Sequence, residues 1–228
     1  MKNKTLFLLL ILTITSFSCK KQESTDDSSL NKTPIDTISK SQTESISDSS
    51  EAYTSQTLKT KTGKTIKVKV EMKDASLTSI AVLPVDFEFS HEPFIVEDSD
   101  PLTNLFVSDL DGNGFDEFYL VTTSVGSGSY GNIYGFASNQ DKSLTPIYVP
   151  QITEKDLDVG SMFQGYMGHD SIYLDQGKLV RKFPVYLEGD PNCCPTGGKR
   201  HLQYNLVAGE AGWILKAEID PDNQDNDN

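Results

Sequence analysis

The stretch from Phe106 to Phe136 constrains the fold of this chain most, because it places one β-type run between two glycine-rich turns. The run from Phe115 to Thr123 is rich in aromatic and β-branched residues, which are typical of strands. The acidic turn Asp109-Leu-Asp-Gly-Asn-Gly114 precedes the run, and the loop Gly126-Ser-Gly-Ser-Tyr-Gly131 follows it. A loop that strands hold at both ends, with one projecting aromatic ring, is a typical binding element.

The rest of the chain predicts further short strands separated by turn residues. Thr65 to Lys73 alternates apolar and charged side chains, as a half-buried strand does. Thr153 begins a capping-box pattern, which predicts a short helical segment towards Asp158. Other strands are expected at 77–83 and 85–89, separated by Pro84, and at 94–97, 102–108, 132–138, 144–149, 171–174, 178–186, 200–207 and 213–219. This pattern predicts an all-β fold, an antiparallel β-sandwich or barrel-like domain with a short helical segment.

The N-terminus has the pattern of a bacterial lipoprotein signal. Two lysines precede a short apolar segment, Leu6 to Ile14, which is too short to span a bilayer. Ser18 stands directly before Cys19, as a small residue does in a lipobox, although Ser16 replaces the usual aliphatic residue. We therefore expect cleavage before Cys19 and lipidation of its thiol, which would anchor the domain in the bacterial cell envelope, on the periplasmic or surface face of the outer membrane. The alternative is an ordinary secretory signal.

Composition divides the chain into four segments. Residues 1–18 form the expected signal peptide, and residues 19–57 have the Ser-, Thr- and Asp-rich composition of a disordered tether. Residues 58–220 are expected to form one domain large enough to bury a core, and residues 221–228 an acidic tail. The formal net charge of -13 argues against nucleic acid, since phosphate contacts need a basic patch. Such acidity favours a cationic partner. The alternative is that it only keeps an exported protein soluble.

The acidic turn resembles calcium-binding loops of the D-x-D-x-[DN]-G type, so calcium is the one cofactor that the sequence suggests. It is closer to the loops of integrin-type β-propeller repeats than to an EF-hand, because Leu120 stands where an EF-hand needs its twelfth-position Glu. The alternative is a plain Asx turn whose carboxylates face water. The expected metal ligands are the oxygens of Asp109, Asp111, Asn113, Phe115 and Glu117.

Cys193 and Cys194 are adjacent, and three states are open to them: a disulfide with each other, a pair across a dimer, or free thiols. None of the three His residues has a ligand-spaced Cys or His nearby, so we expect no transition-metal site. The loop from Gly126 to Gly131 matches G-x-G-x-x-G by letter. A strand rather than a helix is expected after it, which argues against a dinucleotide site.

The tetrad Ser127-Gly128-Ser129-Tyr130 resembles the S-G-x-Y loop of bacterial inhibitors of invertebrate-type lysozymes. The likeness extends roughly from Thr65 to Leu215, most of the folded domain. It includes the acidic turn and three further stretches: Gly165-Tyr-Met-Gly-His-Asp170, Phe183-Pro-Val-Tyr186, and Gly189-Asp-Pro-Asn192 with Pro195-Thr-Gly-Gly198. The adjacent cysteines are a departure with no firm link to inhibition in that family.

The resemblance implies an antiparallel β-sandwich, often a homodimer, whose S-G-x-Y loop enters the lysozyme cleft. Ser127 would hydrogen-bond the catalytic acid of the lysozyme, and Tyr130 would act as a rigid interface anchor. Such a protein is not an enzyme, and the sequence shows no paired nucleophile and base. The alternative function is a calcium-stabilised surface adhesion or glycan-binding module built on the acidic turn.

Overall fold

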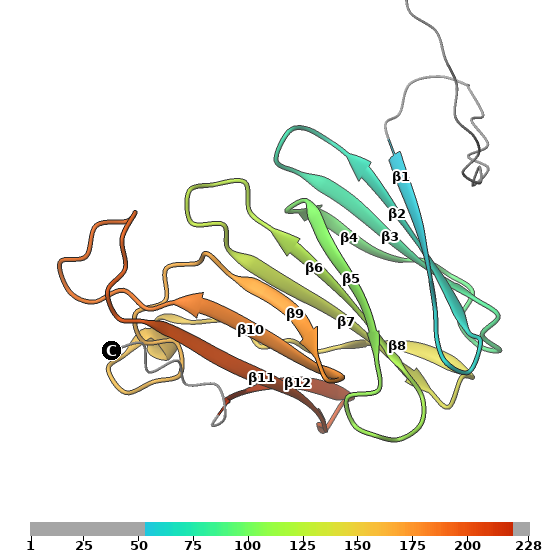
Figure 1. Cartoon of the computed structure of the whole chain (residues 1–228). Helices are drawn as coiled ribbons and strands as arrows, with labels where there is room; N and C mark the ends of the chain where they lie inside the picture. Colours follow the sequence, from blue (N-terminus) through green and yellow to red (C-terminus); the bar gives the residue numbers. More distant parts are fainter. Residues whose placement is uncertain (1–52, 221–228) are drawn as a thin grey trace, which may run out of the picture. The chain divides into compact units, whose positions relative to one another are not determined.

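Twelve strands in three antiparallel sheets make up residues 53–220, the part of the chain that this computed structural model describes (Figure 1). The expected signal peptide, the lipidation site at Cys19, most of the tether and the acidic tail lie outside the described residues. Each sheet is a meander of four consecutive strands, so every pairing joins neighbours in the sequence. The predicted all-β antiparallel sandwich is therefore confirmed, and the structure adds a third sheet to it.

The three sheets follow one another along the chain. The first contains β1 (Tyr53–Lys59), β2 (Thr65–Met72), β3 (Thr78–Val85) and β4 (Phe94–Ser99). The second, which we call the central sheet, contains β5 (Leu102–Ser108), β6 (Glu117–Thr123), β7 (Gly131–Asn139) and β8 (Ser143–Ile147). The third contains β9 (Ser171–Asp175), β10 (Lys178–Pro184), β11 (Lys199–Ala208) and β12 (Trp213–Ile219), and the 3-10 turn η1 (Glu154–Leu157) precedes it.

The central sheet is covered on both faces, and β6 shows this most clearly. Phe118 and Leu120 pack into a core shared with the first sheet. Tyr119 and Val121, which point to the opposite face, pack into a core shared with the third sheet. All four side chains are at most 2% exposed. Three layers therefore stack through β6, which explains why its sequence is an unbroken apolar run rather than an alternating one.

Two boundaries differ from those expected. β1 begins at Tyr53, within the segment predicted as tether, and it pairs with β2 along its whole length. From Thr54 to Lys59 the polar side chains are exposed and only Leu58 packs against the core, so this stretch has no hydrophobic pattern to detect. β3 also runs through Pro84, contrary to the predicted break. Pro84 lies beyond Val82, the last residue paired with β4, where β3 is bonded on one side only and a missing N–H is tolerated.

The short helical segment is the 3-10 turn η1, and the Thr153 N–H donates a hydrogen bond of 2.7 Å to the Asp156 carboxylate, as the capping pattern predicts. Between residues 53 and 220, no helix has the length and apolarity needed to cross a bilayer. The described part of the chain is thus built almost wholly from strands.

Truncation of a buried side chain in β6 should strongly destabilise the fold. Leu120 is fully buried, so Leu120→Ala is expected to lower the free energy of unfolding by about 2–5 kcal/mol. Leu187→Ala is the matched control, because that side chain is 53% exposed and its loss should change stability by about 0.5 kcal/mol or less. Urea unfolding of both variants measures the difference. Equal losses would contradict the three-layer arrangement.

Candidate functional site

The loop between β6 and β7 is closed at its neck by hydrogen bonds, and it projects from one end of the central sheet (Figure 1). The Ser124 N–H donates to the Tyr130 carbonyl at 2.9 Å, and the Tyr130 N–H donates back to the Ser124 hydroxyl at 2.8 Å. Within the loop, the Ser129 N–H donates to the Gly126 carbonyl at 3.0 Å. These bonds give the loop a defined conformation.

The tip of this loop presents a hydroxyl and an aromatic ring to solvent. Ser127 is exposed, and Tyr130 is 44% exposed. The Tyr130 ring folds over Gly128, where a Cβ would lie 2.3 Å from a ring carbon, so only glycine permits this position of the ring. The other support is an edge-to-face contact with Tyr166, whose ring centroid is 5.7 Å away. The Tyr130 ring is thus held in place with almost half of its surface free.

The segment Gly165–Asp170 supports the loop from the adjacent surface. The His169 N–H donates to the Gly128 carbonyl at 2.5 Å. A Cβ on Gly168 would lie 2.0 Å from the same carbonyl oxygen, and Gly168 has a φ of +87°. Both the close approach and the left-handed backbone require glycine there. Two stretches that the sequence analysis singled out separately therefore meet in the structure.

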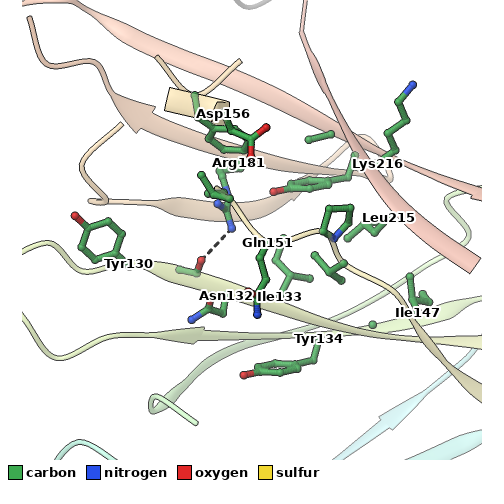
Figure 2. Close-up of a pocket in the computed structure, with 18 of the residues that line it drawn as sticks. Tyr130, Asn132, Ile133, Tyr134, Ile147, Gln151, Asp156, Arg181, Leu215 and Lys216 are labelled. Atoms are coloured by element: carbon green, nitrogen blue, oxygen red, sulfur yellow. Dashed lines mark hydrogen bonds between the residues drawn. The ribbon is translucent and has the colours of Figure 1, made fainter. Parts of the chain in front are cut away.

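A buried ion pair fixes the base of the loop through Gly131. The Asp170 carboxylate accepts the Gly131 N–H at 2.7 Å and the Tyr166 hydroxyl at 2.6 Å. The Arg181 guanidinium donates to the Gly131 carbonyl at 2.9 Å (Figure 2). Arg181 is 4% exposed, and its Nε lies 3.7 Å from Asp170 Oδ1. Burial, reinforced by the Asp170 charge, raises the pKa of Tyr166, which keeps its hydroxyl a donor.

A second loop, residues 187–198, lies at the same end of the molecule (Figure 1). The Tyr186 N–H before it donates to the Gly165 carbonyl at 2.9 Å, and the Tyr186 ring stacks on His169 at a centroid distance of 6.2 Å. Inside it, backbone N–H groups that donate to the Asp190 carboxylate lower the pKa of that group. Cys193 and Cys194 form a disulfide with each other, one of the three states that the sequence left open. The second loop is therefore joined to the segment that supports the first.

A groove of about 920 Å³ opens beside the base of the first loop, with Tyr130 at one end (Figure 2). β8 pairs with β7 only from Gly135 to Asn139, so residues 131–134 of β7 have no strand partner on the groove side. Ile133, Tyr134, Ile152 and Leu215 contribute to its largely apolar lining. A groove of this size and lining is typical of ligand sites.

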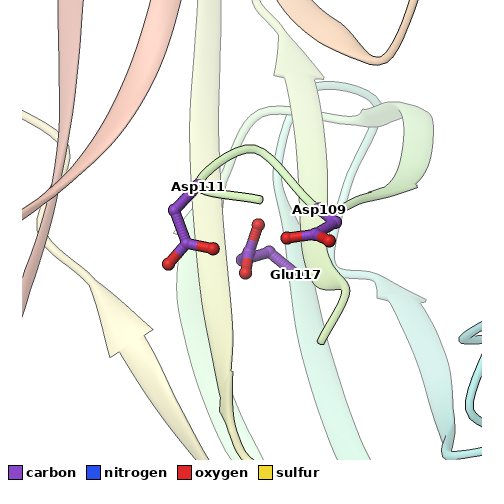
Figure 3. A group of neighbouring side chains, drawn as sticks. All are labelled: Asp109, Asp111 and Glu117. Atoms are coloured by element: carbon purple, nitrogen blue, oxygen red, sulfur yellow. The ribbon is translucent and has the colours of Figure 1, made fainter. Parts of the chain in front are cut away.

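The acidic turn lies at the other end of β6, between β5 and β6. One carboxylate oxygen from each of Asp109, Asp111 and Glu117 lies within 4.8 Å of the others (Figure 3). These are the three carboxylates among the five expected ligands. The Asn113 amide oxygen accepts the Phe115 N–H at 2.7 Å, and the Asn113 amide nitrogen donates to Asp111 at 2.8 Å, so Asn113 also forms an Asx turn.

Two residues absent from the sequence prediction complete this acidic group. The Lys61 ammonium lies 2.6 Å from Asp109, and the Lys61 N–H donates to Asp116 at 2.6 Å. Lys61 comes from the turn between β1 and β2, which is distant in sequence from the acidic turn, so no local motif predicts its contact with Asp109. Burial, and then the neighbouring carboxylates, raise the pKa of Glu117 to about 8.

Arg181 at the first loop was also missed, although the sequence carries a signal for it. Arg181 stands two residues from Leu179 and two from Phe183, which are both buried. Residues at this spacing share one face of a strand, so Arg181 lies on the inward face of β10. A cation at such a position indicates a buried partner.

No protein family, curated protein or solved structure matches this chain. The features of the molecule that point to a function lie at the two ends of β6.

A methyl group at Gly168 should disturb the loop. Gly168→Ala is expected to cost about 1–2 kcal/mol for the left-handed backbone and about 1–3 kcal/mol more for the clash with Gly128. Gly160→Ala is the matched control, because Gly160 has a similar φ of +85° and no atom within 4 Å of its added Cβ. Urea unfolding should therefore show the larger loss for Gly168→Ala. A loss no larger than that of the control would argue against the contact between the loop and its support.

Proposed function

We propose that this protein is an inhibitor of invertebrate-type lysozyme that inserts the β6–β7 loop into the active-site cleft of that enzyme. One observation carries the proposal: the loop tip exposes Ser127 and Tyr130, while its neck and base are fixed by hydrogen bonds and a buried ion pair. A loop that is already ordered loses little conformational entropy on binding, so more of its contact energy appears as affinity.

The chemistry of the tip suits a glycosidase cleft. A lysozyme cleaves its substrate with two carboxyl groups, one of which is protonated, in an open groove. The Ser127 hydroxyl can donate to a carboxylate and accept from a carboxylic acid, so it can bond either group. The Tyr130 ring offers an apolar face and a polar tip, the combination that is enriched in interface anchors. The loop would then occupy the space of the sugar chain.

The charge and the expected location of the chain agree with this proposal. A formal net charge of -13 favours encounter with a positively charged enzyme. A lipid anchor at Cys19 would keep the inhibitor in the bacterial envelope, close to the peptidoglycan that a lysozyme attacks. In this role the chain itself catalyses no reaction.

Removal of either tip side chain should weaken inhibition. Tyr130→Ala and Ser127→Ala are each expected to cost about 1–4 kcal/mol of binding, which raises the inhibition constant from about fivefold to several hundredfold. The measurement is the inhibition of peptidoglycan lysis by an invertebrate-type lysozyme. Tyr148→Ala is the control, because Tyr148 is 64% exposed and bridges to Ile214 of β12, away from the loop. That variant should inhibit as strongly as the unmodified protein.

Circular dichroism and urea unfolding of each variant separate a lost contact from a lost fold. Full inhibition by folded Tyr130→Ala and Ser127→Ala would refute the assignment of the loop. A protein that leaves invertebrate-type lysozyme active but binds cells or glycans in a calcium-dependent manner would instead be the adhesion or glycan-binding module that the acidic turn suggests.

A further inference from the structure

The acidic group between β5 and β6 contains buried carboxylate oxygens that accept no hydrogen bond. Among residues 53–220, Asp109 Oδ1 and Glu117 Oε1 are both buried and have no hydrogen-bond partner. The Glu117 side chain is 0% exposed, so water does not compensate for the missing partner. A buried carboxylate oxygen without a partner is costly, and such an atom in a native fold calls for an explanation.

The second oxygen of each carboxylate is held by the backbone. Glu117 Oε2 accepts the Leu110 N–H at 2.8 Å, and Asp109 Oδ2 accepts the Gly114 N–H at 3.0 Å. These bonds hold one oxygen of each carboxylate on the backbone and leave the other facing the space between the acidic groups. The Glu117 carboxylate lies between those of Asp109 and Asp111 (Figure 3). The arrangement therefore holds three acidic groups around one small space.

Lys61 balances only part of this charge. Its ammonium contacts Asp109 at 2.6 Å and Asp116 at 3.5 Å, and its side chain is 49% exposed. The contact at Asp109 is made to Oδ2, so it leaves Oδ1 free. A cation placed here could thus be bound by three carboxylates, including the two oxygens, Asp109 Oδ1 and Glu117 Oε1, that have no hydrogen-bond partner.

We propose that Asp109, Asp111 and Glu117 bind a calcium ion. Oxygen ligands alone, with no sulfur or imidazole, are typical of hard divalent cations rather than zinc or copper. The three oxygens lie within 4.8 Å of one another, close enough for all of them to reach one ion at a Ca²⁺–oxygen distance of roughly 2.4 Å. Backbone carbonyls and water would complete the six to eight oxygens that calcium takes.

The ion would strengthen the fold rather than contact a lysozyme. The acidic turn lies at the opposite end of β6 from the β6–β7 loop. Lys61 ties the same turn to the first sheet, since its N–H donates to Asp116 and its ammonium to Asp109. An ion at this position would join the β5–β6 turn to a strand that is buried on both faces. This inference is independent of the proposed function, and either one can fail alone.

The test is a calcium titration of the full chain, monitored by calorimetry and by thermal unfolding. Millimolar calcium should raise the unfolding temperature of the unmodified protein, because a ligand that binds only the native state stabilises it. Glu117→Gln keeps the shape of the side chain but removes its charge, so the calcium affinity should fall at least about tenfold and the thermal shift should disappear. Glu71→Gln, which removes a charge from an exposed position in β2, should keep the full shift.

Asp111→Asn provides a second variant, because Asp111 is only partly buried and its replacement should leave the fold intact. It should also weaken calcium binding. Terbium gives a spectroscopic readout, since the Tyr119 hydroxyl lies 3.5 Å from Glu117 Oε2 and the ring can sensitise an ion at the site. Tyr119→Phe should lose this emission and keep the calcium shift.

Two results would overturn the proposal. One is the absence of heat and of any thermal shift at millimolar calcium. The other is an equal shift in Glu117→Gln and Asp111→Asn, which would place the ion elsewhere. Lysozyme inhibition by folded Glu117→Gln tests the proposed function of the β6–β7 loop independently of calcium binding.

Discussion

The burial of β6 on both faces is the constraint on which the rest of this structure depends. Its side chains enter two cores in turn, and the first and third sheets are each packed against one of its faces. A strand in this position cannot shift by one residue without exchanging the two faces, so its register is strongly determined. Both candidate sites are attached to the ends of this strand and take their rigidity from it.

The β6–β7 loop shows how a rigid strand becomes a rigid probe. The strand fixes one end of the loop. At the other end, Asp170, which directly precedes β9, and Arg181 of β10 bind both polar backbone groups of Gly131. A buried ion pair contributes little net stability in general, but removal of one partner leaves an uncompensated charge, so the arrangement is specific. The loop is thus positioned by two sheets, although its own residues come from one hairpin.

Much of the fold was accessible from the sequence because short strands and glycine turns leave local patterns. The alternation in β2 and the apolar run of β6 were visible in this way. β1 was not, because its exposed polar side chains follow no hydrophobic period. Of the candidate sites, the residues of the S-G-x-Y loop and three carboxylates of the acidic group were named in advance. Lys61 and Arg181 were not, since their partners are distant in sequence.

By itself, the sequence determined the all-β class, the short antiparallel strands and the two turns that flank β6, because side-chain periodicity and glycine conformation act over a few residues. Only the tertiary structure decided that a third sheet covers the central one, that the segment Gly165–Asp170 lies against the loop, and that Asp109 Oδ1 and Glu117 Oε1 in the acidic group are buried without hydrogen-bond partners. These features depend on contacts between distant segments, and burial of a polar atom is a property of the packed chain rather than of any local motif.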